Sequence, residues 1–214
     1  MKRLGLALLL PLLLVASAAC KTEDKPVVYR ELTDDDLRAM VLKVEDLPPG
    51  YTLSTEVLVN NEEFAKAFEN TETVRGLVDS WGRAGGLENQ FANTDAPDKP
   101  FQPLRVASAV SRYTDVLKAK DAWKGRNELD QHLKVQPAAI KTLDNPRIGD
   151  QSETRRWYVT DEQGRDLVVY SVSFRKGTVL GNVTTTALKN KDDRGKHAIQ
   201  YTKLLNERTG RQLK

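Results

Sequence analysis

Three strand-like segments joined by short turns dominate the last third of this 214-residue chain. Arg155–Thr160, Leu167–Arg175 and Thr178–Ala187 are separated by connections that contain Gly164 and Gly177. Short glycine-bearing connections between segments of this length predict an antiparallel meander. Alternate positions of the middle segment form one apolar face, made of Val168, Tyr170, Val172 and Phe174.

Helical patterns flank these strands. Thr33 followed by three aspartates predicts a helix start, because the hydroxyl can cap the helix and the carboxylates favour its positive end. This helix is expected to end near Leu47–Gly50, where two prolines cannot continue it. The remaining pattern predicts strands at 51–59, 87–92, 104–113 and 140–143. It also predicts four helices, which begin at Asn60, after Asn70, at Thr114 or Asp115, and at Asp192 or Asp193. The last of these helices is expected to end at Gly210. The predicted class is α+β: an antiparallel β-sheet with a C-terminal three-strand meander, packed against several helices as an α/β sandwich.

One predicted strand, Leu104–Tyr113, has small residues along one face. Ala107, Ala109 and Ser111 alternate there. We expect a packed helix to approach the sheet closely over these residues.

The first 19 residues have the three parts of a signal peptide. A basic start (Met1–Arg3) precedes an apolar run (Leu4–Val15) and a small-residue exit (Ala16–Ala19). The apolar run is shorter than the roughly 18 residues that a spanning helix needs. Cys20 follows at once and is the only cysteine. The arrangement resembles a bacterial lipobox, in which the thiol receives a diacylglycerol and becomes the mature N-terminus.

Ordinary secretion is the alternative, because Ser17 stands where the lipobox usually has leucine. Cleavage after Ala18 or Ala19 would then leave Cys20 as a free thiol. Lipidation is the preferred interpretation, since a lone exposed thiol is reactive outside the cell and two acyl chains provide stable anchoring. The predicted partner of Cys20 is therefore the membrane, at the extracytoplasmic face of the cell membrane.

This interpretation divides the chain into a signal peptide (1–19), a lipidated cysteine with its tether (20–32) and a single globular domain (33–214). The domain then has no cysteine for a disulfide, a zinc–thiolate site or a nucleophile. Of the 33 basic residues, Lys2 and Arg3 belong to the leader, which leaves 31 against 30 acidic residues. A nearly neutral protein lacks the basic surface of a nucleic-acid-binding protein, so no nucleic acid partner is expected.

The motifs of catalysis and metal binding are missing from the sequence pattern. His132 and His197 have no serine or aspartate at a recognisable motif spacing, and surface histidines explain them best. A metal site would require the two to converge in space. Asp34–Asp36 lacks the alternate spacing of a calcium loop and is explained by a helix start. We therefore expect no cofactor, no metal and no enzymatic activity.

Aromatic residues provide the candidate ligand site. The residues that could line a cavity between the sheet and the helices, with a cation for an anionic group, are Trp81, Trp123, Trp157, Tyr170, Phe174 and Arg175. Core packing is the simpler interpretation of the aromatics. Arg155, Arg156, Arg175 and Lys176 occupy ends of the meander strands and could meet an anionic ligand or a lipid headgroup. Solvated charges are the simpler interpretation.

The order of these elements resembles a known family. Its marks are Leu47–Tyr51 after a helix, Val106–Tyr113 running into an alanine-containing helix, Ile148–Ser152, the hairpin Phe174–Thr178, and a closing helix. Together they resemble the extracytoplasmic sensor-like domains of actinobacterial lipoproteins and of the mycobacterial serine/threonine kinase PknH. They are more loosely similar to lipoproteins with a PsbP-like sheet.

The resemblance implies an α/β sandwich with a cleft and no catalytic set. This chain departs from the kinase sensor because it lacks the disulfide cysteines and any kinase domain. The expected function is a lipid-anchored, non-enzymatic binding or sensor-like module that holds a small or amphiphilic ligand in a sheet–helix cleft. The alternatives are an interaction lipoprotein that assists an envelope complex through a protein-binding surface, and a hydrolase built around a buried histidine.

Overall fold

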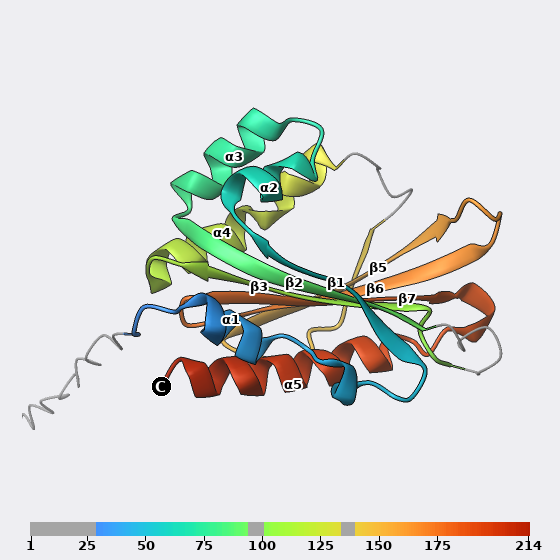
Figure 1. Ribbon diagram of the computed structural model, residues 1–214. Helices are drawn as coiled ribbons and strands as arrows, with labels where there is room; N and C mark the ends of the chain where they lie inside the picture. Colours follow the sequence, from blue (N-terminus) through green and yellow to red (C-terminus); the bar gives the residue numbers. More distant parts are fainter. Residues whose placement is uncertain (1–28, 94–100, 134–139) are drawn as a thin grey trace, which may run out of the picture.

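The computed structural model describes residues 29–93, 101–133 and 140–214. These residues form one antiparallel sheet with the strand order β1-β2-β3-β7-β6-β5-β4 (Figure 1). The strands are β1 (Tyr51–Val59), β2 (Arg83–Asn93), β3 (Arg105–Tyr113), β4 (Lys141–Leu143), β5 (Gln151–Thr160), β6 (Asp166–Lys176) and β7 (Val179–Leu188).

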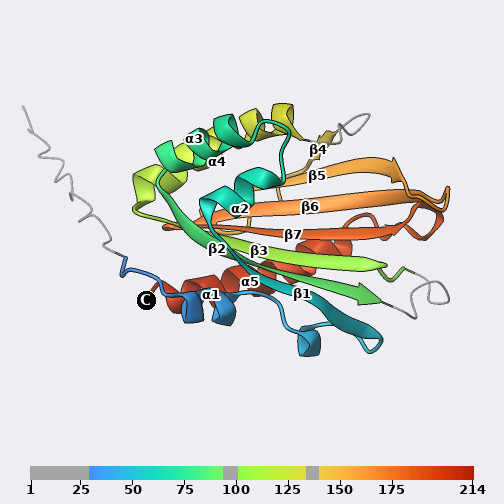
Figure 2. The same cartoon turned by 45° about the horizontal axis from the view of Figure 1, so that its top comes forward.

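Helices cover the two faces of the sheet unequally. The helices are α1 (Asp34–Met40), α2 (Asn61–Lys66), α3 (Thr71–Ser80), α4 (Val116–Leu129) and α5 (Lys196–Gln212), with short 3-10 turns η1 (Val44–Asp46), η2 (Asp130–His132) and η3 (Lys189–Lys191). α1 and α5 lie along one face, whereas α2, α3 and α4 gather over one end of the other (Figures 1 and 2). The predicted α+β class is confirmed.

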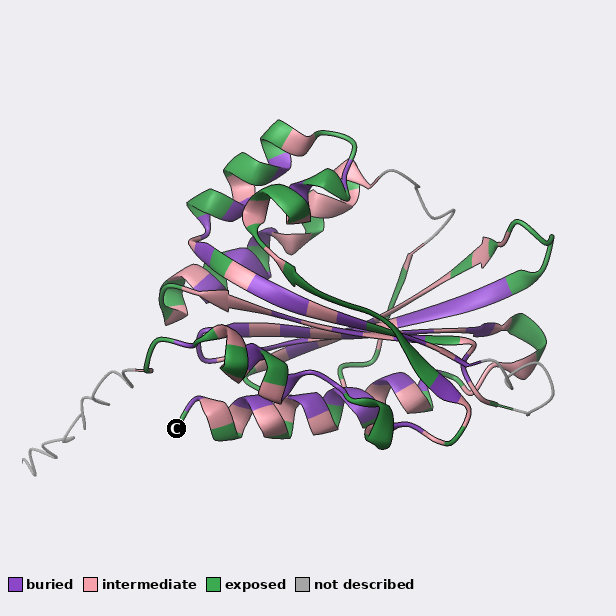
Figure 3. Ribbon diagram, in the orientation of Figure 1, coloured by how far each residue is buried: buried purple, intermediate pink, exposed green. Residues whose placement is uncertain are grey.

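The predicted meander is also confirmed, because β5 pairs with β6 and β6 pairs with β7, both antiparallel. Its alternating apolar residues pack against α1 and α5 in the main core, which includes Val172, Phe174, Leu37, Met40 and Leu205. Burial alternates along β7 between buried residues on this side and half-buried residues on the other (Figure 3). The second face of the sheet is therefore only partly covered.

The first helix ends earlier than predicted, at Met40 instead of Leu47. Thr33 does cap it, with its side chain accepting from the backbone amide of Asp36. The chain then runs extended, because Leu42 is fully buried on the sheet and both its backbone groups are bonded there. Its amide donates to Ser108 Oγ, and its carbonyl accepts from Asn89 Nδ2.

Other boundaries differ from the prediction as well. β5 begins at Gln151, four residues before the predicted start at Arg155. β2 begins at Arg83, four residues before the predicted strand, with a bulge between Arg83 and Gly85. α5 is preceded by Gly195 at a φ of 76° and runs past Gly210 to Gln212. Asp193 bonds the first turn from outside the helix, since its carboxylate accepts from the amides of Gly195 and His197.

The predicted leader (1–19) and the tether up to residue 28, Cys20 included, lie outside the described residues. Within residues 29–93, 101–133 and 140–214, no helix has the length and apolar character needed to cross a bilayer.

Candidate functional site

A cavity of about 280 Å³ lies between the sheet and the helices α2, α3 and α4. Its volume is close to the lower end of the range for ligand pockets, about 300 Å³. The lining residues are Phe64, Val78, Trp81, Ala122, Trp123, Arg126 and Leu129 on the helix side, and Ala109, Val110, Ser111, Tyr113, Ser173, Phe174, Leu180, Gly181 and Asn182 on the strand side. A larger hollow of about 350 Å³ near Tyr29 is walled by the chain just before α1 and by strand ends, without a tryptophan.

The cavity exists because the small-residue face of β3 is not closely covered. Ala109 and Ser111 form part of the cavity floor, and Ala107 lies beyond it in the open part of the sheet face. The expectation of a closely packed helix over these three residues is therefore wrong. The large side chains of Trp81 and Trp123 are buried on the helix side of the cavity.

The position of Trp81 depends on a glycine in the neighbouring helix. Trp81 follows the last residue of α3, and its ring packs against Gly125 in the middle of α4. A Cβ atom at Gly125 would lie 2.9 Å from Cε2 of Trp81 and closer still to Cζ2. Trp123 comes from the same buried face of α4 as Ala119 and Ala122. The helix side of the cavity is thus an aromatic wall in which Trp81 and Gly125 pack closely together.

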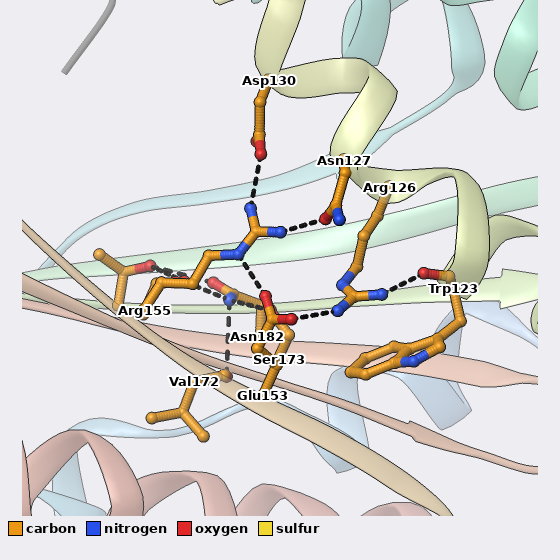
Figure 4. Close-up of polar contacts among 11 residues, drawn as sticks. Trp123, Arg126, Asn127, Asp130, Glu153, Arg155, Val172, Ser173 and Asn182 are labelled. Atoms are coloured by element: carbon orange, nitrogen blue, oxygen red, sulfur yellow. Dashed lines mark hydrogen bonds and ion pairs between the residues drawn. The ribbon is translucent and has the colours of Figure 1, made fainter. Parts of the chain in front are cut away.

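One side of the cavity is closed by a network of four alternating charges (Figure 4). Arg126 Nη2 donates to Glu153 Oε2 at 2.5 Å, and the guanidinium lies 3.9 Å from the centre of the Trp123 ring. Glu153 also accepts from Arg155, which in turn donates to Asp130 at 2.8 Å. The four side chains are 17 to 34% exposed, so solvent screens these ion pairs only partly.

A strip of neutral polar groups continues the floor from this network across β6 and β7. Asn182 Nδ2 donates to Ser173 Oγ at 2.9 Å and to Ser171 Oγ at 2.7 Å. Thr184 Oγ1 donates to Asn182 Oδ1 at 3.0 Å. Ser173 and Asn182 line the cavity, whereas Thr184 belongs to the open part of the face. The site therefore combines an apolar wall with hydrogen-bonding groups on its floor.

A buried cation lies behind the opposite end of the cavity. Arg83 is 5% exposed, and its Nε donates to Ser111 Oγ at 3.1 Å. Its guanidinium also lies 4.7 Å from the centre of the Phe64 ring. Burial lowers the pKa of Arg83 to about 10 and raises the pKa of the neighbouring Tyr113 to about 12, so that both remain protonated at neutral pH.

The structure brings three of the six predicted site residues together. Trp81, Trp123 and Phe174 are among the lining residues, but the ring of Phe174 packs in the main core on the α1 and α5 side, over Gly181. The other three are not among the lining residues. Tyr170 lies in the core on the α5 side and donates to Asp192 at 3.0 Å.

Arg175 makes structural contacts within the fold and does not offer a free cation to a ligand. It is 5% exposed and bonds to Gln151, to the carbonyl of Gly177 and to Asp150. Trp157 is half-buried on β5, paired with Val169 of β6.

Sequence reasoning missed the polar residues of the site. Arg126 and Glu153 come from segments 27 residues apart, and each looks like an ordinary surface charge in its own segment. Arg83 lies close to several glycines in the sequence, and Gly86 is the one that indicates where the Arg83 side chain lies. A Cβ there would lie 2.6 Å from Arg83 Nη2, so the missing side chain makes room for the guanidinium. An arginine next to glycines in a strand was the available signal.

The histidines form no catalytic constellation in the described residues. His197 Nδ1 lies 2.5 Å from Asp193 Oδ2, and no hydroxyl is hydrogen-bonded to the ring there. Burial acts to raise the pKa of Asp193, but the hydrogen bonds from the His197 ring and from two backbone amides outweigh it and lower that pKa. His132 lies apart in η2, and the described residues contain no group of three His, Cys, Asp or Glu arranged to hold a metal.

The chain matches no protein-family model and no curated protein. Among solved structures it is similar to the extracellular domain of PknH from Mycobacterium tuberculosis, with a TM-score of 0.49 and 9% sequence identity. The matched region covers 86% of this chain and 100% of that one.

Proposed function

We propose that this protein is a non-enzymatic binding module, held by a lipid on Cys20 at the extracytoplasmic face of the cell membrane. The cavity beneath α3 and α4 holds a small or amphiphilic ligand. The observation that carries this proposal is the combination of two tryptophans, a polar floor and an ion-paired rim in one cavity. Ligand pockets are mostly apolar with a few placed polar groups, which is the composition found here.

The leader supports the location. Its basic start, apolar run and small-residue exit direct a chain out of the cytoplasm, and Cys20 stands where a lipobox cysteine would be acylated. A tether of about a dozen residues then separates the anchor from Thr33, the cap of the first helix. An anchored domain with this reach would meet amphiphiles at the membrane surface.

Native mass spectrometry of the full-length protein, expressed in a bacterial host and recovered from its membranes, tests both parts. The covalent lipid remains on the chain after denaturation, whereas a cavity ligand appears only under native conditions. We expect a native adduct of defined mass that denaturation removes. A native mass equal to the denatured mass would contradict the binding function.

A matched pair of variants locates the adduct. Ala109 and Ala107 lie on the same face of β3, two residues apart, but only Ala109 lines the cavity. Ala109→Leu fills the cavity and should lose the adduct, whereas Ala107→Leu should retain it. Equal retention in both variants would place the ligand elsewhere.

A second candidate function, an interaction lipoprotein, is favoured by one feature of the sheet edge. β1 is an edge strand whose outer residues are exposed, including Leu53, Val57 and Leu58 at 40 to 45%. An exposed apolar edge strand is a site for pairing with another chain. A photo-crosslinking residue at Val57 should then capture one envelope protein in cells, whereas the same residue at the exposed Leu117 of α4 should not.

A further inference from the structure

The buried guanidinium of Arg83 has no ionic partner in the described part of the chain. Its hydrogen bonds go to neutral oxygens, Ser111 Oγ at 3.1 Å and Asn61 Oδ1 at 2.8 Å. The nearest carboxylate in this chain of contacts is the exposed Asp79, which accepts from Asn61 Nδ2 instead of from Arg83. A buried charge is costly unless it is paired, so this arrangement leaves a positive charge that the fold does not neutralise.

The other charges around the cavity are balanced. Arg126 and Arg155 face Glu153 and Asp130 in the rim network, two cations against two anions. Arg112, a cation that interacts electrostatically with Arg83, is paired with Asp34 at 2.9 Å. Among the charged groups of the described residues around the cavity, the positive charge of Arg83 is therefore the one without an opposite charge beside it.

Two hydroxyl groups connect this charge to the cavity. Ser111 lines the cavity and accepts from Arg83, so its own proton is free to be donated. Tyr113 is the cross-strand partner of Arg83, lines the same cavity, and its hydroxyl makes no hydrogen bond among the described residues. A hydroxyl polarised by a neighbouring cation is a good donor to an anion.

We infer that the ligand of this cavity is an anion with a short apolar chain, whose charged group lies at the Ser111–Tyr113 end and balances Arg83. The inference rests on the proposed function and adds the charge and size of the ligand to it. A volume of about 280 Å³ accommodates roughly ten non-hydrogen atoms when about 30 Å³ is allowed for each. Octanoate has ten non-hydrogen atoms and decanoate has twelve, so a medium-chain carboxylate is close to this size, and its tail would contact Trp81 and Trp123.

Three ligands of equal length test the charge. Decanoate, decanol and decylammonium carry charges of −1, 0 and +1 at neutral pH. The full-length protein, freed of non-covalently bound lipid, is titrated by calorimetry with each ligand kept below its micellar concentration or its solubility limit, which gives three dissociation constants. We expect decanoate to bind at least about tenfold more tightly than decanol, because a buried charge attracts an anion through a medium of low dielectric constant, and decylammonium to bind most weakly.

Variants of Arg83 assign the preference to this residue. Arg83→Lys keeps the positive charge and should keep the order of affinities, with decanoate tightest and decylammonium weakest. Arg83→Met should bring decanoate and decanol to nearly equal affinity. Arg75→Met removes an exposed arginine of α3 and serves as the control that changes nothing. If Arg83→Met does not fold, the comparison of the three ligands on the unaltered protein still decides the question.

The outcomes separate the two proposals. Decanol binding as tightly as decanoate would overturn the inference about charge and leave the binding function standing. Failure of all three ligands to bind would overturn the binding function together with the inference. An unchanged decanoate preference in a folded Arg83→Met protein would overturn the role of Arg83.

Discussion

The ring of Trp81 lies directly against Gly125 of α4, in the space that a side chain at that position would occupy. This contact fixes the distance between α3 and α4 and therefore the helix wall of the cavity. A glycine in the interior of a helix costs about 0.5–1 kcal/mol relative to alanine. Gly125 carries this cost, but the Trp81 ring can pack there only because the position has no side chain.

Gly125→Ala should therefore destabilise the protein by about 1–3 kcal/mol, the usual cost of overpacking, although alanine is the better helix former. Gly76→Ala is the matched control, because Gly76 lies within α3 and a Cβ there meets no atom within 4 Å. That substitution should stabilise the protein by about 0.5–1 kcal/mol. Urea unfolding of both variants gives the comparison, and stabilisation by Gly125→Ala would refute the close packing of Trp81 against Gly125.

Glu153 joins two arginines of the rim, so its loss leaves both with one partner fewer. Glu153→Gln should lower the free energy of unfolding by about 1–3 kcal/mol. Asp166→Asn is the control, because its pair with Lys189 is longer, at 3.4 Å, and mostly exposed. That change should cost less than about 0.5 kcal/mol. Equal effects in the two variants would show that the rim network does not act as a structural unit.

Asp193 makes the stability of α5 dependent on pH. Its pKa in the folded protein is lower than the ordinary value of 3.8, because its hydrogen bonds outweigh the effect of burial. Its stabilising contribution is therefore complete above that ordinary value and is lost as the pH falls through the lower folded pKa. Asp193→Asn should cost about 0.5–2 kcal/mol at neutral pH, and the difference from the unaltered protein should shrink in acid.

Thermal unfolding across an acid-to-neutral pH series measures this difference. Asp121→Asn, an exposed change on α4, serves as the control and should leave the whole profile in place. A constant offset between Asp193→Asn and the unaltered protein, extending unchanged into strong acid, would show that the carboxylate charge is not the cause.

Cys20→Ser removes the proposed acylation site. We expect the variant to leave the membrane fraction, since the proposed lipid on Cys20 is the anchor. Fractionation of cells followed by immunoblotting measures the distribution, with metabolic labelling by a fatty acid as the direct readout of the lipid. Membrane retention of an unlabelled Cys20→Ser protein would point to a different anchor.

Local chemistry was enough to predict most of the fold. Thr33, Asn60 and Asp115 each cap the helix that follows them, because their side-chain oxygens satisfy free amides of the first turn. The three meander strands followed from alternating apolar residues and short turns. These signals lie within a few residues of one another, so a single sequence contains them.

The cavity could not be predicted in the same way, because its residues come together only through long-range packing. Tyr170 and Phe174 share the face of β6 that packs in the main core with α1 and α5, yet Phe174 is among the residues that border the cavity and Tyr170 is not. Arg83 and Ser111 are 28 residues apart, and their hydrogen bond depends on the register between β2 and β3. The periodicity of a strand predicts which face of the sheet a residue lies on. It does not predict which helices cover that face or how closely they pack against it.

The three tryptophans provide the most direct test of the cavity as the ligand site. Trp81 and Trp123 line it, whereas Trp157 lies outside it on β5 and serves as an internal reference. Their indole signals in a two-dimensional nitrogen–proton NMR spectrum can be assigned by replacing each tryptophan with phenylalanine. Titration with decanoate, and separately with decanol, should move the signals of Trp81 and Trp123 and leave that of Trp157 in place. Three stationary signals with both ligands, or a Trp157 signal that moves as far as the other two, would contradict a ligand site beneath α3 and α4.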